Sequence, residues 1–503
     1  MPHRRALAIG AALVALAPPA AAPPAPRHTT PAVPGAPAVL HWQPCPSVSW
    51  GLVCSSLSVP LDYAHPQGRR IILALSEAPA TAGPGQRLGD LVVNPGGPGV
   101  PGRYLAALVQ SVLPASLASR YNIIGFDPRG VGASVPSMHC DPTYLQPVQP
   151  DYVPATQADE LALEAKARGY AQACERRYGW LLPYMTTVDT ARDLGSLRVA
   201  LGVSRISYLG FSYGTYIGEV YATLFPHRVA RMVLDSTVDP QGVWYADNLA
   251  QDVAAQARMH ALFAWTARYA STYHLGTTAA GVEAAFLRAR ARLAASPVPH
   301  QLGPDELDDD FVAGLYSTSV WPSLAAALAA YLHQGSPAVL ETLYATIGAT
   351  NENEFAVYNA VECSDARWPR DWQRWDTDTR RLLSRAPLVT WDNTWFNAAC
   401  AFWPVTGPAK PFRVGAPGLP GVLMVPASLD AATPYPGALQ AHRDLPSSRM
   451  VVVEGDGNHG QLVSTPPNLC VIGYVARYLA TGALPTGPGP VNATCPPAAL
   501  PTP

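Results

Sequence analysis

The stretch from Arg205 to Thr215 constrains the fold more than any other part of the chain. It begins as a compact apolar run typical of a buried strand, passes through Gly-Phe-Ser-Tyr-Gly, and continues with apolar residues at helical spacing. Gly210 and Gly214 are small enough for the chain to turn sharply between the two elements. We therefore predict a strand, a tight turn and a helix, with Ser212 exposed at the strand tip and facing the positive end of the helix dipole.

A second loop at a strand end carries glycine and proline in place of larger side chains. A short apolar strand predicted over residues 90–93 leads directly into Asn94-Pro-Gly-Gly-Pro-Gly. Such a loop leaves backbone N–H groups uncovered, and an oxyanion needs donors of this kind. In isolation the motif also fits an ordinary turn, but its pairing with the Ser212 turn favours the oxyanion role.

Strand and helix patterns alternate on both sides of a long helical segment. From residue 241 to residue 413 the alternation disappears, and this segment holds nine of the twelve tryptophans. We expect residues 39–240 and 414–503 to form an α/β core, with a mostly parallel sheet covered by helices on both faces. Residues 241–413 are expected to form an inserted helical cap.

The N-terminus has the features of a signal peptide. Arg4 and Arg5 precede an apolar stretch over residues 6–17, and small residues follow at 20–22. The apolar stretch is too short for a membrane span, so a secreted protein is expected. Proline and alanine dominate the remainder of this leader, which we place at residues 1–38.

The cysteine content also fits an exported protein. Eight cysteines, an even number, show no Cys-x-x-Cys pair and no cysteine–histidine spacing typical of zinc, so we expect four disulfides and no metal. Pairing each cysteine with its sequence neighbour has the lowest loop-closure cost among the connectivities that remain open. The cysteines are Cys45, Cys54, Cys140, Cys174, Cys363, Cys400, Cys470 and Cys495.

A catalytic serine needs a base and an acid, and two further strand ends supply them. Ser212, Asp430 and His459 each lie just beyond a predicted strand, so all three are expected at one edge of the sheet. His459 would accept the serine proton, and Asp430 would orient and stabilise the imidazolium. Asp235, which ends the strand after the Ser212 turn, is the alternative acid. Asp456 lies too close to His459 along the chain to orient its ring.

Another charged loop follows the strand predicted over residues 121–126. It contains Asp127 and Arg129 between glycines, an arrangement open to a catalytic role. A buried ion pair that braces neighbouring loops is the commoner use of such residues. We expect the bracing role.

Taken together, these motifs resemble a known group of enzymes. Asn94-Pro-Gly-Gly-Pro-Gly, Asp127-Pro-Arg-Gly-Val-Gly-Ala-Ser, Gly210-Phe-Ser-Tyr-Gly-Thr and the loops of Asp430 and His459 resemble the secreted tripeptidyl aminopeptidases of actinomycetes. That group belongs to the proline-iminopeptidase branch of the α/β-hydrolases. The resemblance implies an exopeptidase that releases short peptides from a free N-terminus, beneath a helical cap that restricts access.

The resemblance also assigns roles to individual residues. It makes Ser212 the nucleophile, Asp430 the acid and His459 the base. It makes the backbone N–H groups of Gly97 and Tyr213 the oxyanion hole.

In proline iminopeptidases, glutamates of the cap bind the substrate amine. The helical segment of this chain offers Glu354, Glu362 and Asp365 for that role. Cys363 would pin the segment of Glu362 and Asp365 through a disulfide, and nearby tryptophans would wall the cleft. The alternative is that these carboxylates are ordinary solvated residues of the cap.

Three functions remain open on the sequence. The first is a secreted serine aminopeptidase that removes di- or tripeptides through an acyl-enzyme, and the second is a carboxylesterase acting on small acyl esters. The third is an inactive binding protein with a hydrolase fold, against which the intact triad argues. The formal net charge of −2 gives no basic excess, so nucleic acid is excluded as a partner. We expect a monomer without cofactor whose partner is its peptide or ester substrate.

Overall fold

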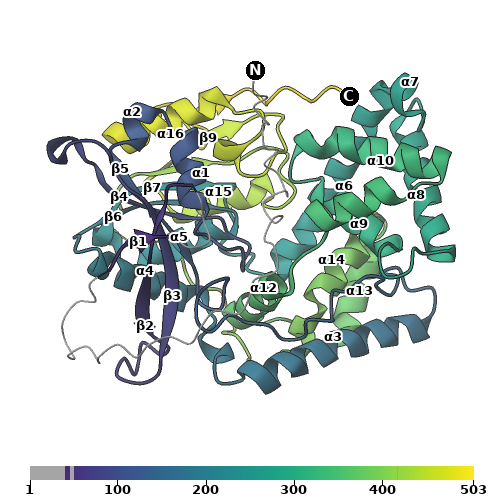
Figure 1. Ribbon diagram of the computed structural model, residues 1–503, viewed down its shortest axis with the longest axis horizontal. Coiled ribbons are helices and arrows are strands. Elements are labelled where there is room, and N and C mark those ends of the chain that lie inside the picture. The colour runs from purple at the N-terminus through teal and green to yellow at the C-terminus, as the bar shows by residue number, and fades with distance from the viewer. Residues whose placement is uncertain (1–39, 46–49, 416) are drawn as a thin grey trace.

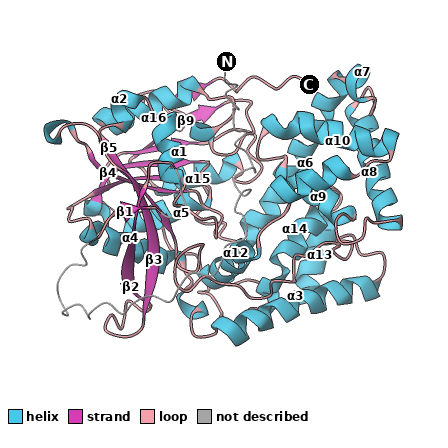
Figure 2. Cartoon of the chain, viewed as in Figure 1, coloured by secondary structure: helices cyan, strands magenta, loops and turns pink. Residues whose placement is uncertain are grey.

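The computed structural model describes residues 40–45, 50–415 and 417–503, so the predicted leader lies outside the described residues. It contains one ten-stranded sheet with helices on both faces, and a helical body beside the sheet (Figures 1 and 2). The strands are β1 (Gln43–Pro44), β2 (Val53–Pro60), β3 (Arg70–Ala78), β4 (Gly89–Asn94), β5 (Tyr121–Asp127), β6 (Ile206–Phe211), β7 (Val229–Asp235), β8 (Val422–Val425), β9 (Ser448–Val453) and β10 (Ala493–Cys495).

The sheet is parallel from β5 onwards and antiparallel at its opening edge. Its strand order is β1-β2-β3-β5-β4-β6-β7-β8-β9-β10. The pairs β1–β2, β2–β3 and β3–β5 are antiparallel. Every other neighbouring pair in the sheet is parallel. The predicted α/β class, with a mostly parallel sheet behind opening antiparallel strands, is confirmed.

Alternating side chains of the strands build two apolar layers. In β4, Leu91 and Val93 join the layer on one face, whereas Val92 joins the layer on the other. Helices α1 (Leu105–Val112), α2 (Ala115–Ala118) and α16 (Leu469–Thr481) cover the first face. Helices α4 (Thr187–Ala200), α5 (Tyr213–Leu224) and α15 (Tyr435–Asp444) cover the second.

The chain between β7 and β8 forms helices, which gather to one side of the sheet (Figure 1). Much of this body packs around its own apolar cluster, which includes Trp265, Phe286, Phe311 and Trp321. The longer helices are α6 (Tyr245–Arg268), α8 (Ala279–Ala295), α9 (Pro304–Ala313), α10 (Trp321–Gln334), α12 (Glu352–Asp365), α13 (Trp372–Leu382) and α14 (Thr390–Asn397), with α7 (Ala270–Tyr273), α11 (Ala338–Leu343), a π-helical turn (Tyr344–Gly348) and a 3₁₀ turn (Ala398–Phe402) between them.

Helix α12 joins this helical body to the sheet. The Asn351 side chain caps α12 by accepting a hydrogen bond from the backbone N–H of Glu354. Glu352 accepts hydrogen bonds from the backbone N–H groups of Cys140 and Asp141 at 2.7 and 2.9 Å. These contacts fix the start of α12 against the segment that precedes α3 (Gln157–Tyr178).

All eight cysteines are paired, each with its sequence neighbour. The bonds join Cys45 to Cys54, Cys140 to Cys174, Cys363 to Cys400 and Cys470 to Cys495. The expected connectivity is therefore confirmed, and the third bond ties α12 to the end of the helical body.

The predicted ion pair between Asp127 and Arg129 is wrong, although both residues do brace loops. Asp127 pairs with Arg103, Nε to Oδ2 at 3.0 Å. Arg129 pairs with Asp193 of α4 at 2.8 Å, and both of these side chains are buried. Each charge of the loop therefore pairs with a residue from outside the loop.

Among the described helices, none combines the length and the apolar character that crossing a bilayer requires.

Candidate active site

Ser212 lies between the end of β6 and the start of α5, as predicted. Its φ of 55° and ψ of −132° place it in a conformation that non-glycine residues rarely adopt. A Cβ on Gly210 would approach the Gly214 carbonyl oxygen to 2.3 Å, and one on Gly214 would meet the Asn94 side-chain oxygen at 2.7 Å. The turn therefore requires glycine on both sides of the serine.

The glycine-rich loop after β4 lies directly against this turn. A Cβ added to Gly96, whose φ is 96°, would lie 2.9 Å from the Ser212 Cβ and 3.0 Å from the Tyr213 nitrogen. Gly97, Ser212 and Tyr213 line one cavity. Within the described part of the chain, the backbone N–H groups of Gly97 and Tyr213 donate no hydrogen bond, so they are free to serve an oxyanion.

His459 and Asp430 form a hydrogen-bonded pair at the same edge of the sheet. His459 Nδ1 lies 2.9 Å from Asp430 Oδ2 and 3.1 Å from Oδ1. Asp430 also accepts hydrogen bonds from the backbone N–H groups of Ala432 and Thr433 at 2.9 and 3.1 Å. The backbone N–H of His459 donates to the Tyr316 carbonyl oxygen at 2.8 Å, which ties the histidine loop to the helical body.

The contact between His459 and Asp430 lowers the pKa of the aspartate and raises the pKa of the histidine, as expected for a catalytic base and its acid partner. Burial opposes ionisation of Asp430, but the charge and hydrogen bond of His459 outweigh it, and the pKa of Asp430 falls below its ordinary value. Burial also disfavours the imidazolium, but Asp430 outweighs burial here too, and the pKa of His459 rises. His459 Nε2 is buried and has no hydrogen-bond partner among the described residues, and His459 lines the cavity together with Ser212.

Asp235, the alternative acid, has a different role in the structure. Its two carboxylate oxygens accept hydrogen bonds from the backbone N–H groups of Gln461 and Leu462 at 2.9 and 2.7 Å. Burial raises the pKa of Asp235 to about 7, against these hydrogen bonds. Asp235 thus holds the loop behind His459, and the direct contact with the imidazole belongs to Asp430.

The cavity above Ser212 has a volume of about 380 Å³ and extends between the sheet edge and the helical body. Glu354 and Glu362 of α12 line it, as does Trp244. Asp365 does not line the cavity, because Thr187 holds its carboxylate through the backbone N–H at 2.7 Å and through the hydroxyl. Of the three predicted cap carboxylates, the structure brings two to the cavity.

Both of these glutamates are held in conditions that disfavour their charge. Burial raises the pKa of Glu354 to about 7, and the Asn351 amide partly opposes this shift. Burial raises the pKa of Glu362 well above its ordinary range, although Tyr358 and Asn248 hydrogen-bond to it. A cation in the cavity would stabilise the carboxylate form of either residue.

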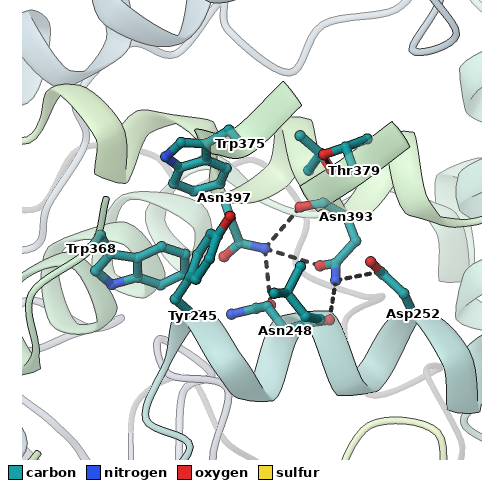
Figure 3. A pocket seen from close by; sticks show the side chains of 10 residues that line it. Tyr245, Asn248, Asp252, Trp368, Trp375, Thr379, Asn393 and Asn397 are labelled. Atoms are coloured by element: carbon teal, nitrogen blue, oxygen red, sulfur yellow. Dashed lines mark hydrogen bonds between the residues drawn. The ribbon is translucent and has the colours of Figure 1, made fainter. Parts of the chain in front are cut away.

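Sequence reasoning missed three further carboxylates of this cavity, those of Asp252, Asp309 and Asp392. Asp252 borders a smaller neighbouring pocket, where the Asn393 amide donates to it at 2.8 Å (Figure 3). For Asp309 the sequence offers the acidic run Asp305-Glu-Leu-Asp-Asp-Asp, whose orientation depends on how α9 packs.

Comparisons with known proteins show the family to which this chain belongs. Residues 386–495 match the family described as TAP-like protein, and residues 91–303 match the alpha/beta hydrolase fold family. A tripeptidyl aminopeptidase of Streptomyces coelicolor is 41% identical over 92% of this chain and 87% of its own. Serine protease Hip1 of Mycobacterium bovis is 32% identical over 91% of each chain. Carboxylesterase B of Mycobacterium tuberculosis is 31% identical over 88% of this chain and 86% of its own.

Each of these three relatives aligns with 88% or more of this chain. The chain belongs to the tripeptidyl aminopeptidase family of α/β-hydrolases.

Proposed function

We propose that this protein is a secreted serine aminopeptidase that releases di- or tripeptides from free N-termini. The observation that carries the proposal is the pairing of His459 with Asp430 beside a cavity that Ser212 also lines. Ser212 acts as the nucleophile, His459 as the base and Asp430 as the acid of a triad. Four disulfides fit an oxidising compartment and support the secreted location.

The reaction proceeds through an acyl-enzyme. Ser212 Oγ attacks the scissile carbonyl carbon while its proton passes to His459 Nε2. The N–H groups of Gly97 and Tyr213 stabilise the oxyanion that forms. The C–N bond then breaks, and His459 returns the proton to the leaving amine. Water attacks the acyl-enzyme by the same route in reverse, which frees the short peptide and restores Ser212.

Recognition of the free N-terminus is assigned to the cap carboxylates. An internal segment of a polypeptide lacks an ammonium group, so a carboxylate in a partly dry cleft distinguishes the two substrates. Glu354 and Glu362 line the cavity and are the residues proposed for this role. Charge-assisted hydrogen bonds of this kind contribute about 1.5–3 kcal/mol. We assign the cap to residues 241–413.

The test compares tripeptidyl p-nitroanilides with a free N-terminus, the same anilides acetylated at the amine, and p-nitrophenyl esters of short acids. The proposal expects the free tripeptidyl anilides to have the highest kcat/KM, and acetylation to lower it by about tenfold or more. Equal hydrolysis of the free and acetylated peptides would refute recognition of the amine.

The second candidate is a carboxylesterase, favoured by the similarity to Carboxylesterase B. It uses the same triad and oxyanion hole, but it needs no contact with an ammonium group. Rapid hydrolysis of the esters together with no cleavage of any peptidyl anilide would favour this candidate.

A further inference from the structure

The active-site cavity is strongly acidic. Among the residues that the structure describes, five carboxylates line it and no lysine or arginine does. The carboxylates belong to Asp252, Asp309, Glu354, Glu362 and Asp392.

Two basic side chains act on these carboxylates from outside the cavity lining: Lys166 interacts with Asp309, and Arg290 opposes the burial that raises the pKa of Asp392. Among the described residues, none of the five carboxylates forms an ion pair with lysine or arginine. Arg290, a cation of the neighbouring helix α8, already pairs with Asp151 at 2.5 Å, Asp308 at 2.8 Å and Asp305 at 3.7 Å. Because burial raises the pKa of all five carboxylates, a cationic ligand in the cavity would favour their ionised form.

The cationic ligand that fits this arrangement is organic. No group of three or more His, Cys, Asp or Glu side chains in the described ranges is positioned to hold a metal ion. The acidic groups are instead distributed over helices α6, α9, α12 and α14, along the walls of a cavity of about 380 Å³. His459 also lines this cavity, and its buried Nε2 has no hydrogen-bond partner among the described residues. This is a separate observation that indicates a ligand site in the same cavity.

The carboxylates fall into distinct parts of the cavity. Glu354 lies beside the oxyanion loop, because a Cβ on Gly99 would meet its carbonyl oxygen at 2.5 Å. Asp309 and Asp392 lie on α9 and α14, within the helical body. Burial raises the pKa of Asp309 well above its ordinary range, and the charge of Asp392 raises it further. Both side chains line the cavity, and their helices α9 and α14 pack against each other.

On the basis of the proposed aminopeptidase function, we propose that Asp309 and Asp392 form a second cation subsite, which binds a lysine or arginine side chain of the peptide. Glu354 and Glu362 then remain available for the α-ammonium group. A lysine or arginine side chain between Asp309 and Asp392 would donate charge-assisted hydrogen bonds to both carboxylates and would favour their ionised form. The substrate class is therefore short N-terminal peptides that carry a basic residue.

The experiment uses the mature protein with tripeptidyl p-nitroanilides that differ at one position. Lysine is compared with the uncharged norleucine, and arginine with citrulline, at each of the three residues in turn. We expect lysine or arginine to raise kcat/KM by about tenfold or more at one of these positions. In the Asp309→Asn/Asp392→Asn variant, the ratio of kcat/KM for the basic peptide to kcat/KM for its neutral counterpart should fall below about twofold.

Taking the ratio within each variant cancels any general loss of activity. Glu341→Gln, on helix α11 and outside the cavity lining, is the control for a change of one charge in the helical body. It should retain the preference of the unsubstituted protein. Asp309→Asn and Asp392→Asn are also measured singly, and thermal unfolding verifies that each variant is folded.

Two outcomes would overturn the proposal while leaving the aminopeptidase function intact. One is cleavage of the neutral peptides with no preference for a basic residue at any position. The other is a double variant that loses activity on norleucine and lysine peptides by the same factor, which would assign the α-ammonium to Asp309 and Asp392. Failure of the unsubstituted protein to cleave any tripeptidyl anilide would instead refute the aminopeptidase function itself.

Discussion

At the scale of single residues, the structure separates two buried aspartates that the sequence leaves as alternatives. Asp430 contacts the imidazole of His459, whereas Asp235 accepts hydrogen bonds from the backbone behind it. The first arrangement holds the ring in the orientation that a base requires, and the second holds the loop. The two residues should therefore differ sharply when each is replaced by its amide.

Asp430→Asn should lower kcat by a factor on the order of 10³–10⁴, because an amide neither fixes the tautomer of His459 nor stabilises its charge. Asp235→Asn should lower kcat much less and should lower the free energy of unfolding by about 1–3 kcal/mol, through a lost acceptor for a buried N–H group. Steady-state kinetics and chemical denaturation of both variants measure these effects. The reverse order of the kcat losses would make Asp235 the acid.

The pH dependence should reflect the raised pKa of His459. Only neutral imidazole accepts the serine proton, so activity should be lost as pH falls through this pKa. Because Asp430 outweighs burial in raising it, the acidic limb of kcat/KM on a neutral ester should lie above the ordinary value of 6.5. An acidic limb below that value would contradict the charge state assigned to the pair.

At the scale of elements, helix α12 connects substrate recognition to the catalytic loop. Asn351 caps its start, and Cys363 ties it by a disulfide to Cys400. Between these anchors, Glu354 and Glu362 line the cavity. Asp365, just beyond Cys363, accepts a hydrogen bond from the backbone N–H of Thr187 instead. The four carboxylates of this helix are thus expected to divide into two that recognise substrate and two, Glu352 and Asp365, that support structure.

Glu354→Gln and Glu362→Gln should raise KM for peptides with a free amine by about tenfold or more, and should hardly change hydrolysis of a small neutral ester. Asp365→Asn is the matched control from the same helix. It should leave peptide KM unchanged and lower the unfolding temperature, because the Thr187 N–H loses its charged acceptor. Equal KM values for all four proteins would place amine recognition elsewhere in the cavity.

The elements also show which parts of the site local sequence can predict. The positions of Ser212, Asp430 and His459 follow from the ends of short apolar strands, because parallel strands deliver their carboxyl ends to one edge. The acidic lining of Asp309 and Asp392 does not follow from periodicity. It depends on the rotation and packing of α9 and α14, which are tertiary properties. The mistaken Asp127–Arg129 pair has the same origin, since Arg103 and Asp193 come from other elements.

At the scale of the whole molecule, the four disulfides close short segments and leave the sheet and helical body to be joined by packing. Their sequence separations are 9, 34, 37 and 25 residues. Loops of this length contribute roughly 3 kcal/mol each in the chain-entropy description. The N-terminal edge, α3, α12 and the C-terminal strand each carry one of these bonds.

The mature protein should therefore contain no free thiol. Titration with a thiol reagent in denaturant should detect none of the eight cysteines before reduction and all eight afterwards. The count of eight thiols after reduction is the control, because incomplete denaturation would lower it. Free thiols on most cysteines before reduction would contradict the expected oxidising compartment.

The most direct test of the whole account is to identify the residue that an active-site-directed fluorophosphonate modifies. We predict that mass spectrometry of the digested protein maps the adduct to Ser212 alone. Ser212→Ala should abolish labelling and should leave only a residual rate of peptide hydrolysis. Labelling of the unsubstituted protein at another serine, or full activity of Ser212→Ala, would contradict the proposed mechanism.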